Sequence, residues 1–495
     1  MLRRLALATA LLPSLLAAQA KSDPARGFDA YAAKAVRDWR AVGLAVVVVK
    51  DGQIVFAKGY GVRELGKPDL VDTNTRFSIG STTKAITAAA LGMLVDEGKV
   101  RWDDPVTKYL PGFQLYDPYV TREITVRDLL THRAGLPNAD FLWYGTDYST
   151  AEIVRRMRYV KPAYSLRSGF IYHNIMYATA GEVIAAASGM PWAEFIRSRI
   201  FAPLGMAGSV PLLRETVGQP NVASPHFIVN DTVQVIVNAS VDPVAAAGSI
   251  WSSVADMSKW ARFMIDSGKV GGKRLLQPAT WAELFRPQTT VNLAEFYPSV
   301  GLTKPHWTTY GLGWFQEDYA GRMLQFHTGS IDGMVAIIGL IPDERFGVYV
   351  LANTDHVELR HALMYRAIDT WLGTGTRDWS QEMLALYGGL HARGDSALKK
   401  MEAARITGTE PSLPLEKYAG TYADSLYGEV TISVQNGALR YQAGQVVGSM
   451  EHWQYEIFRV RFDQRWQGSA PVSFMIGLSG TPERLEVQGA TFRRK

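Results

Sequence analysis

The sequence of 495 residues contains no cysteine. Disulfide bridges, thiolate metal sites and a cysteine nucleophile are therefore excluded. A strong excess of one charge is also missing: the formal net charge is +5, and no dense patch of lysine and arginine with interleaved aromatic residues occurs. We therefore expect no binding to nucleic acid. His356 and His361 lack a His-Glu-x-x-His frame, so we expect no metal ion and no other cofactor.

Long hydrophobic runs are missing beyond the amino terminus, where Arg3 and Arg4 precede an apolar segment from Leu5 to Leu16. Ala18-Gln19-Ala20 then has the small-x-small pattern of a cleavage site. This order is typical of a secretory signal peptide, so we expect residues 1–20 to be removed and the protein to be periplasmic or secreted. An uncleaved membrane anchor is the alternative, although the apolar segment is short for a membrane span.

Strand signals at both ends of residues 21–373 enclose a helix-rich middle. The β-branched run Gly43–Val49 and the segment Ile54–Gly59 are joined by an Asp-Gly turn, which is typical of a hairpin. Met334–Ile341 and Phe346–Ala352 form a second apolar pair with a polar turn. We therefore expect an α+β domain in which one antiparallel sheet is flanked by helices, with a helical lobe alongside.

The composition changes towards the carboxyl terminus. Residues 374–414 are charged and predict a helical connector. Residues 415–495 contain short alternating segments, with a tight turn at Asn436-Gly437, and predict an all-β domain. A small barrel or a sandwich is expected there.

Ser81-Thr82-Thr83-Lys84 directly precedes a long run of small and apolar residues. Residues three apart share a helix face, so the serine hydroxyl and the lysine amine can meet. Burial favours the uncharged amine, which can take the hydroxyl proton and make the serine an acylating nucleophile. Ser396-Ala397-Leu398-Lys399 has the same spacing but lies in a charged stretch. That second tetrad is interpreted as part of a solvated helix face.

Tyr172-His173-Asn174 occupies a turn that enters a helical run. A phenol beside a lysine ammonium has a lowered pKa and can transfer a proton between nucleophile and leaving group. The amide of Asn174 can bind a substrate carbonyl. In the alternative interpretation, Tyr172 only packs and Asn174 caps the helix.

His327-Thr328-Gly329-Ser330 comes just before the expected strand Met334–Ile341. On an edge strand, the glycine would let a substrate backbone approach closely, and the next N–H would point into a cleft. An ordinary strand end with a hydrogen-bonded histidine is the alternative.

The order Ser-x-x-Lys, Tyr-x-Asn and His-Thr-Gly resembles the penicillin-binding-protein-like serine hydrolases. This family includes class C β-lactamases, DD-peptidases, D-aminopeptidases and family VIII esterases. The segments Leu129–Pro137, Ala247–Ser249 and Tyr310–Trp314 are also similar to the family. The resemblance extends from about Phe28 to Thr370 and implies a β-lactamase/transpeptidase-like fold.

The resemblance implies a role for each motif residue. Ser81 would be the acylated nucleophile, and Lys84 and Tyr172 would form the base pair, with the division of labour between them open. Asn174 would bind the substrate amide. The N–H groups of Ser81 and Ser330 would form the oxyanion hole, and His327, Thr328 and Gly329 would contact the substrate.

His327 departs from the β-lactamase pattern, which commonly has lysine there. A histidine is expected to titrate near neutrality, which makes a peptidase or an esterase a better match than a β-lactamase. The carboxyl-terminal β-domain resembles the lipocalin-like accessory domain of some peptidases in the family. Such a domain can limit access to the cleft or mediate homo-oligomer formation.

The sequence therefore predicts a secreted serine hydrolase that cleaves amide bonds of small peptides, including D-residue or peptidoglycan-like peptides, through an acyl-enzyme. A carboxylesterase or weak β-lactamase with the same residues is one alternative. A non-catalytic peptide- or peptidoglycan-binding protein is another. The expected partner is a small peptide or ester.

Overall fold

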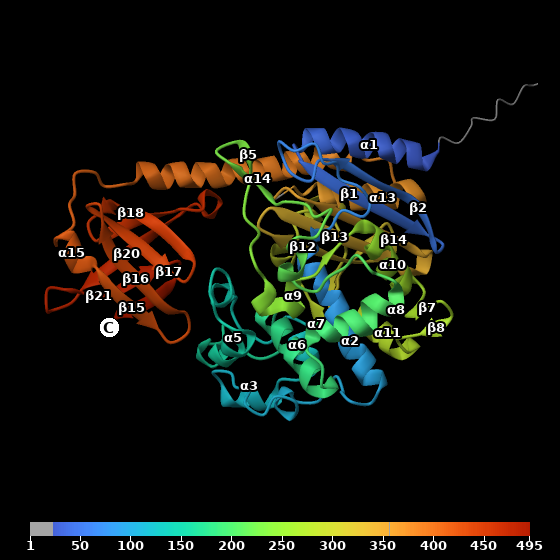
Figure 1. Cartoon of the computed structure of the whole chain (residues 1–495), viewed down its shortest axis with the longest axis horizontal. Helices are drawn as coiled ribbons and strands as arrows, with labels where there is room; N and C mark the ends of the chain where they lie inside the picture. Colours follow the sequence, from blue (N-terminus) through green and yellow to red (C-terminus); the bar gives the residue numbers. More distant parts are fainter. Residues whose placement is uncertain (1–22, 356) are drawn as a thin grey trace, which may run out of the picture.

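A computed structural model of the protein describes residues 23–355 and 357–495, so the predicted signal peptide lies outside the described residues. Its centre is an antiparallel eight-stranded sheet (Figure 1). The strand order begins and ends with segments that are far apart in sequence. From one edge to the other, the strands are β2 (Gln53–Gly61), β1 (Gly43–Lys50), β14 (Phe346–Ala352), β13 (Met334–Ile341), β12 (Arg322–Ile331), β11 (Phe315–Tyr319), β10 (Thr308–Tyr310) and β9 (Thr289–Thr290).

Both hairpins predicted from the sequence are present. Asp51 and Gly52 have φ values of +52° and +77° in the turn between β1 and β2. This left-handed pair is the geometry that an Asp-Gly turn adopts in a two-residue hairpin. β13 pairs with β14 from Val335 opposite Ala352 to Ile341 opposite Phe346. β1 pairs with β14 over its whole length, and so joins the two ends of the domain.

The middle strands are buried on both faces. In β1, Leu44, Val46 and Val48 pack into one hydrophobic cluster, whereas Ala45 and Val47 pack into another. The first cluster includes helices α1 (Pro24–Asp38) and α13 (Leu359–Leu372), and the second includes α2 (Thr83–Asp96) and α10 (Val254–Ile265). Burial on both faces explains why these strands appear as unbroken apolar runs and not as alternating patterns.

The helical lobe is built around α2, whose residues from Thr83 to Leu94 are all buried. This helix packs against α6 (Asn174–Ser188) and α9 (Ala245–Gly248). An apolar helix of this kind belongs in a domain centre. The shorter helices of the lobe and its surroundings are α3 (Pro118–Glu123), α4 (Val126–Leu129), α5 (Thr150–Arg156), α7 (Trp192–Ile196), α8 (Ala202–Leu204) and α11 (Pro278–Phe285).

The carboxyl-terminal part is a closed eight-stranded antiparallel barrel, which decides between the barrel and the sandwich. The long helix α14 (Trp379–Ala403) runs from the main domain to this barrel, which lies beside the helical lobe (Figure 1). Closure comes from pairing of the first strand with the last. After the short helix α15 (Leu415–Tyr418), the strands are β15 (Gly420–Asp424), β16 (Gly428–Gln435), β17 (Ala438–Ala443), β18 (Val446–Gln454), β19 (Ile457–Phe462), β20 (Ser469–Ile476), β21 (Pro482–Val487) and β22 (Ala490–Arg494).

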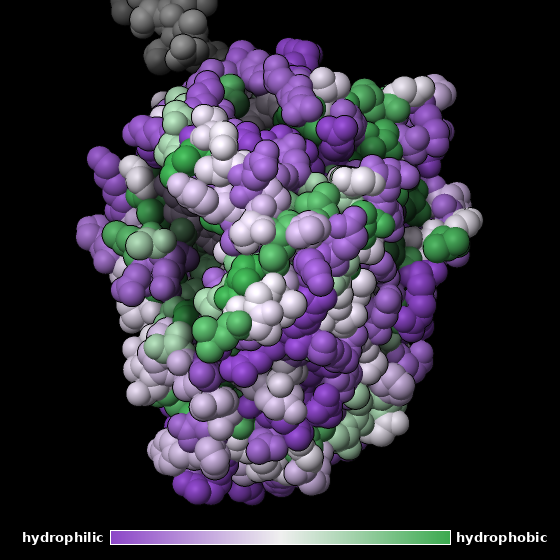
Figure 2. Space-filling view, turned by 90° about the vertical axis from the view of Figure 1, so that its left-hand side faces the viewer, coloured by the Kyte–Doolittle hydropathy of each residue, from purple (hydrophilic) through white to green (hydrophobic). Residues whose placement is uncertain are grey.

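The outer surface on the side of the barrel mixes hydrophilic and hydrophobic residues (Figure 2). The barrel domain exposes several apolar side chains, including Tyr455, Met475 and Leu478. Across residues 23–355 and 357–495, none of the helices combines the length and the apolar character that crossing a membrane requires.

Candidate active site

Ser81 and Lys84 meet at the start of α2. Ser81 lies in a single 3-10 turn (Gly80–Thr82), and Lys84 lies in the first turn of the α-helix that follows. Lys84 Nζ is 2.9 Å from Ser81 Oγ. The lysine side chain is fully buried, whereas Ser81 is partly exposed. The serine hydroxyl is therefore open to a substrate on one side and in contact with the lysine on the other.

The other contacts of Lys84 determine what its nitrogen can do towards the serine. Nζ is 2.7 Å from Asn174 Oδ1 and 2.9 Å from the carbonyl oxygen of Ala247. Both of these oxygens can only accept hydrogen bonds. A neutral amine has two N–H bonds and one lone pair, so donation to these two acceptors directs the lone pair of Lys84 at Ser81 Oγ.

Burial favours that neutral form. It lowers the pKa of Lys84 well below its ordinary value, and the nearby charge of Asp140 opposes the shift only in part. The low-dielectric surroundings disfavour the ammonium form, as the apolar sequence around the tetrad led us to expect. Both the geometry and the lowered pKa of Lys84 therefore suit it to act as a base beside the serine.

Tyr172 lies over the same lysine, whose Nζ is 4.7 Å from the centre of the phenol ring. The expectation that its pKa would be lowered is wrong. Burial raises the pKa of Tyr172 well above its ordinary value, and a hydrogen bond with Ser81 offsets only part of that shift. The phenol is therefore protonated at neutral pH, and Tyr172 is suited to giving a proton before it takes one.

The segment around Ser81 touches the strand that carries the His-Thr-Gly motif. A Cβ on Gly329 would lie 1.9 Å from the carbonyl oxygen of Ile79, and a Cβ on Gly80 would lie 2.7 Å from the nitrogen of Ser330. Gly329 is thus required by the close approach of the protein's own backbone, not of a substrate. This contact places the backbone of the Ser81 turn beside that of Ser330, so an oxyanion hole formed by the N–H groups of Ser81 and Ser330 stays a prediction.

The motif does not lie on an edge strand of the sheet, because β12 has β13 on one side and β11 on the other. However, β11 pairs only with residues up to Phe326. From His327 to Ile331, β12 pairs with β13 alone. This half-open strand end provides the local edge on which the sequence interpretation depended.

His327 is buried and uncharged. Its Nε2 is 3.0 Å from the hydroxyl of Tyr310, and its Nδ1 is 2.6 Å from the carbonyl oxygen of Thr328. Burial and the proximity of Lys84 lower the pKa of His327 to about 3. Titration near neutrality, which we expected from the sequence, is therefore wrong. Thr328 is also engaged, because its hydroxyl lies 2.7 Å from that of Tyr297.

Asn174 is the first residue of α6, and His173 occupies the N-cap position. Its amide lies between Lys84 and Asp140: Nδ2 is 3.1 Å and 3.0 Å from the two carboxylate oxygens. A carboxylate only accepts, so it fixes the amide orientation and points Oδ1 at Lys84. The contact of Asn174 with a substrate amide remains a prediction.

Asp140 is a site residue that the sequence interpretation missed. Its carboxylate also accepts from Trp143 Nε1 at 2.7 Å and from Asn138 Nδ2 at 3.0 Å, so it is held on several sides. It lies three residues beyond the family-like segment Leu129–Pro137. That proximity is the only sequence signal, and nothing in it indicates contact with the Tyr-x-Asn motif.

The sequence interpretation also missed Arg360, because no local sequence pattern indicates it. It lies in α13, and its Nη1 is 2.5 Å from the carbonyl oxygen of Gly329 and 2.8 Å from Ser330 Oγ. Glu358 pairs with it at 3.0 Å. Burial acts to raise the pKa of Glu358, but Arg360 and a hydrogen bond from His361 hold that pKa well below its ordinary value. A charged, buried pair therefore anchors the strand end beside Ser81.

Comparison with family models identifies both parts of the chain. A model described as Beta-lactamase matches residues 28–370, which is the range over which the motifs resembled a known family. A second model, described as a domain of unknown function (DUF3471), matches residues 404–494, which contain the barrel.

Several curated proteins are similar to the chain. Unguisins hydrolase ungD of Aspergillus violaceofuscus is 28% identical over 92% of this chain and 86% of its own. Unguisins hydrolase ungD' of Aspergillus campestris is 30% identical over 80% of this chain and 75% of its own. Protein flp of Staphylococcus aureus is 24% identical over 63% of this chain and 59% of its own.

Solved structures share the fold over nearly the whole chain. The octameric penicillin-binding protein homologue from Pyrococcus abyssi has a TM-score of 0.63 and 21% identity, and covers 94% of this chain and 99% of its own. SurE has a TM-score of 0.58 and 21% identity, and covers 95% and 99%. The chain belongs to the Beta-lactamase family and is a serine hydrolase of the penicillin-binding-protein-like group.

Proposed function

We propose that the protein cleaves amide bonds of small peptides through an acyl-enzyme formed on Ser81. One observation carries the proposal: the fully buried amine of Lys84 lies 2.9 Å from Ser81 Oγ. This arrangement supplies a base for a hydroxyl that would otherwise be a weak nucleophile.

In the proposed reaction, Ser81 Oγ attacks the substrate carbonyl carbon while its proton passes to Lys84 Nζ. The N–H groups of Ser81 and Ser330 stabilise the negative charge on the carbonyl oxygen. Tyr172 then gives its proton to the leaving nitrogen as the C–N bond breaks, and Lys84 returns a proton to Tyr172. A water molecule attacks the ester that remains, and the same groups return the serine to its starting state.

Three observations support a peptide as the substrate. His327 is neutral, so the position lacks the fixed cation that β-lactamases commonly have there. Two similar proteins from Aspergillus are named unguisins hydrolases, which supports a hydrolytic activity for this protein. SurE, which shares the fold, has also been described with D-Leu. Peptides that contain D-residues therefore belong among the first substrates to test.

A fluorophosphonate probe tests the catalytic part of this proposal. Mass spectrometry of the labelled protein should locate the adduct on Ser81, and Ser396 should stay unlabelled as an internal control with the same tetrad spacing. Turnover of D-aminoacyl anilides, D-Ala-D-Ala peptides, short-chain esters and a chromogenic cephalosporin then ranks the substrate classes. An unlabelled Ser81 would favour the non-catalytic binding protein, and faster ester turnover would favour the carboxylesterase.

We also propose that the protein is exported and assembles through its barrel. The amino-terminal segment has the order of a signal peptide, and a similar solved structure is described as octameric. Fractionation of cells should find the protein outside the cytoplasm, with Lys21 as its first residue. Light scattering of the purified protein should give the mass of two or more chains. The mass of a single chain would contradict assembly.

A further inference from the structure

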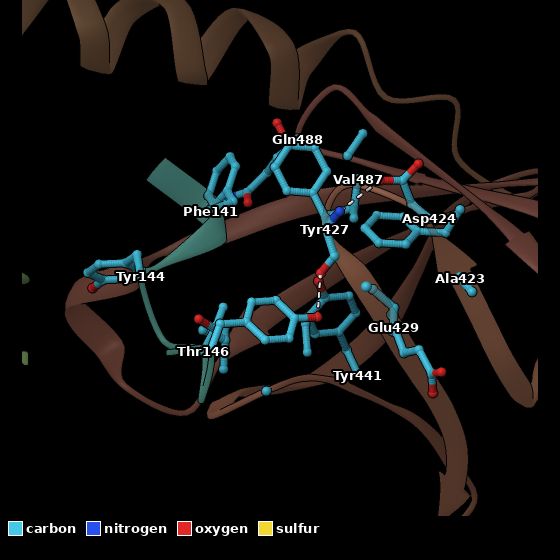
Figure 3. A pocket seen from close by; sticks show the side chains of 18 of the residues that line it. Phe141, Tyr144, Thr146, Ala423, Asp424, Tyr427, Glu429, Tyr441, Val487 and Gln488 are labelled. Carbon is cyan, nitrogen blue, oxygen red and sulfur yellow. Dashed lines mark hydrogen bonds between the residues drawn. The ribbon is translucent and has the colours of Figure 1, made fainter. Parts of the chain in front are cut away.

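A cavity of about 680 Å³ lies between one end of the barrel and the helical lobe (Figure 3). Phe141 and Tyr144 reach it from the lobe, and Tyr427 and Tyr441 reach it from the barrel. Ser81 does not line it, so it is distinct from the serine–lysine pair. Its volume is in the range of cavities that hold small molecules.

The barrel interior is filled at one end and open at the other. Large aromatic side chains such as Phe458 and Phe474 pack in its core. Where the strands approach the lobe, the lining residues include Ala443 and Ala490, whose side chains are small. A barrel of eight strands is just wide enough for its side chains to fill, so small residues at one end leave space.

Tyr441 gives this space a polar feature. The residue is 6% exposed and lines the cavity. Among the described residues its hydroxyl has no hydrogen-bond partner, and burial alone raises its pKa to about 12. Because the residue lines the cavity, this hydroxyl is free to form a hydrogen bond with a group bound there.

The cationic groups that line the cavity, Arg156 and Lys495, are already paired within the protein. Arg156 binds Glu152 at 2.7 Å and also donates to the carbonyl oxygen of Leu426 at 2.9 Å. Lys495 pairs with Glu429. An anionic ligand would have to break these pairs to reach a cation, whereas an uncharged aromatic or aliphatic group would not.

The cavity adjoins the proposed catalytic site on the side of Asp140. Phe141 follows Asp140, the residue that orients Asn174, and its ring lies 6.2 Å from that of Tyr427 in the barrel. Outside the cavity, Trp466 of the barrel domain donates to Asp332 at 3.1 Å, two residues beyond Ser330. The barrel end thus lies over the segments that flank Ser81.

We propose that this cavity is a substrate subsite, which binds a large apolar or aromatic side chain of the peptide at a distance from the bond that is cleaved. The Tyr441 hydroxyl donates to a carbonyl oxygen of the same peptide. The inference rests on the proposed peptidase function and adds to it a preference for substrates long enough to reach the barrel.

The test compares two substrates in variants that fill the cavity. One substrate is a D-aminoacyl anilide, which is too short to reach the barrel, and the other is a longer peptide amide with a tryptophan remote from the scissile bond. In Ala490→Trp, the ratio of kcat/KM for the long substrate to that for the short one should fall about tenfold or more, mainly through KM. Ala438→Trp, at an exposed barrel position, is the matched control and should leave the ratio unchanged.

Tyr441→Phe keeps the volume and removes only the hydroxyl, so it remains informative if the tryptophan variant does not fold. Loss of one neutral hydrogen bond should lower the same ratio by roughly two- to tenfold. An unchanged ratio in both variants would overturn the subsite while leaving the peptidase proposal intact. Absence of turnover of either substrate by the native protein, without an adduct on Ser81, would instead contradict the peptidase proposal itself.

Discussion

At the scale of single residues, the site depends on how acceptors are arranged around one buried nitrogen. Lys84 has two neighbours that can only accept, and the orientation of one of them is fixed by Asp140. The lone pair is therefore directed by hydrogen-bond geometry, and burial keeps it free of a proton. The same Ser-x-x-Lys spacing at Ser396 has neither feature, because the whole stretch from 391 to 400 is exposed.

This contrast gives a matched pair of variants. In Lys84→Ala, the rate of acylation should fall by roughly 10²- to 10⁴-fold, the usual contribution of a general base. Stopped-flow measurement of the acylation burst would show the loss, and thermal unfolding would show whether the fold is kept. Lys399→Ala in the exposed tetrad should acylate normally. A near-normal rate in Lys84→Ala would refute the assigned base.

Asp140→Asn tests the residue that orients the amide. The charge of Asp140 raises the pKa of Lys84, so its removal should lower that pKa further. Because the free amine is the active form, the acidic limb of the pH profile for acylation should move to lower pH, by up to about one unit. Acylation should also slow, since a neutral amide at 140 no longer fixes Asn174. An unmoved limb would show that Asp140 has only a structural role.

How much of the site follows from sequence depends on which contacts are local. Burial of Lys84 could be predicted, because the small and apolar residues that follow it in sequence indicate a helix in a domain centre. The neutrality of His327 could not, because it depends on Tyr310 and on the packing of other strands. Asp140 and Arg360 contact the motifs from separate elements, and neither belongs to a recognisable pattern.

At the scale of elements, the contact between the Ser81 turn and β12 decides where the two N–H groups lie. Both hairpins of the sheet follow from turn residues and apolar runs, so the strands themselves could be predicted. The half-open end of β12 could not, because it results from where β11 stops pairing. Pairing of this kind is a property of the sheet and not of one segment.

Gly329→Ala tests this contact. The added Cβ would lie 1.9 Å from the Ile79 carbonyl oxygen, so the strand and the turn must separate. Displacement of one oxyanion donor should lower kcat by roughly 10²- to 10³-fold. Gly301→Ala is the control, because a Cβ there meets nothing within 4 Å. Normal kcat in Gly329→Ala would mean that the oxyanion donors lie elsewhere.

At the scale of the whole molecule, buried histidines make stability depend on pH. Burial lowers the pKa of His173 to about 4 and that of His327 to about 3. In the unfolded chain both would titrate near 6.5, so below that pH the unfolded state binds more protons than the folded state. The contribution of these neutral histidines to the free energy of unfolding is therefore fully present above about pH 6.5. It is lost as the pH falls towards the pKa values of the two histidines in the folded state.

Each such histidine should lower the free energy of unfolding by at most about 1.4 kcal/mol per pH unit below 6.5. Urea unfolding at pH 7, 6 and 5 measures this slope. His327→Gln should give a shallower slope than the native protein, and replacement of the exposed His391 by glutamine serves as the control. Equal slopes for His327→Gln and the native protein would show that His327 does not stay neutral in the folded state.

The pairing of β1 with β14 has a consequence for the order of synthesis. Leu44 lies opposite Ala352, which follows it by more than three hundred residues. The two strands can therefore pair only after all the residues between them have been synthesised. Closing so long a loop is entropically costly, and sheets built from distant segments form slowly. The amino-terminal segment emerges long before this sheet can form. The central sheet therefore stays open until most of the chain has been made, which is compatible with the proposed export.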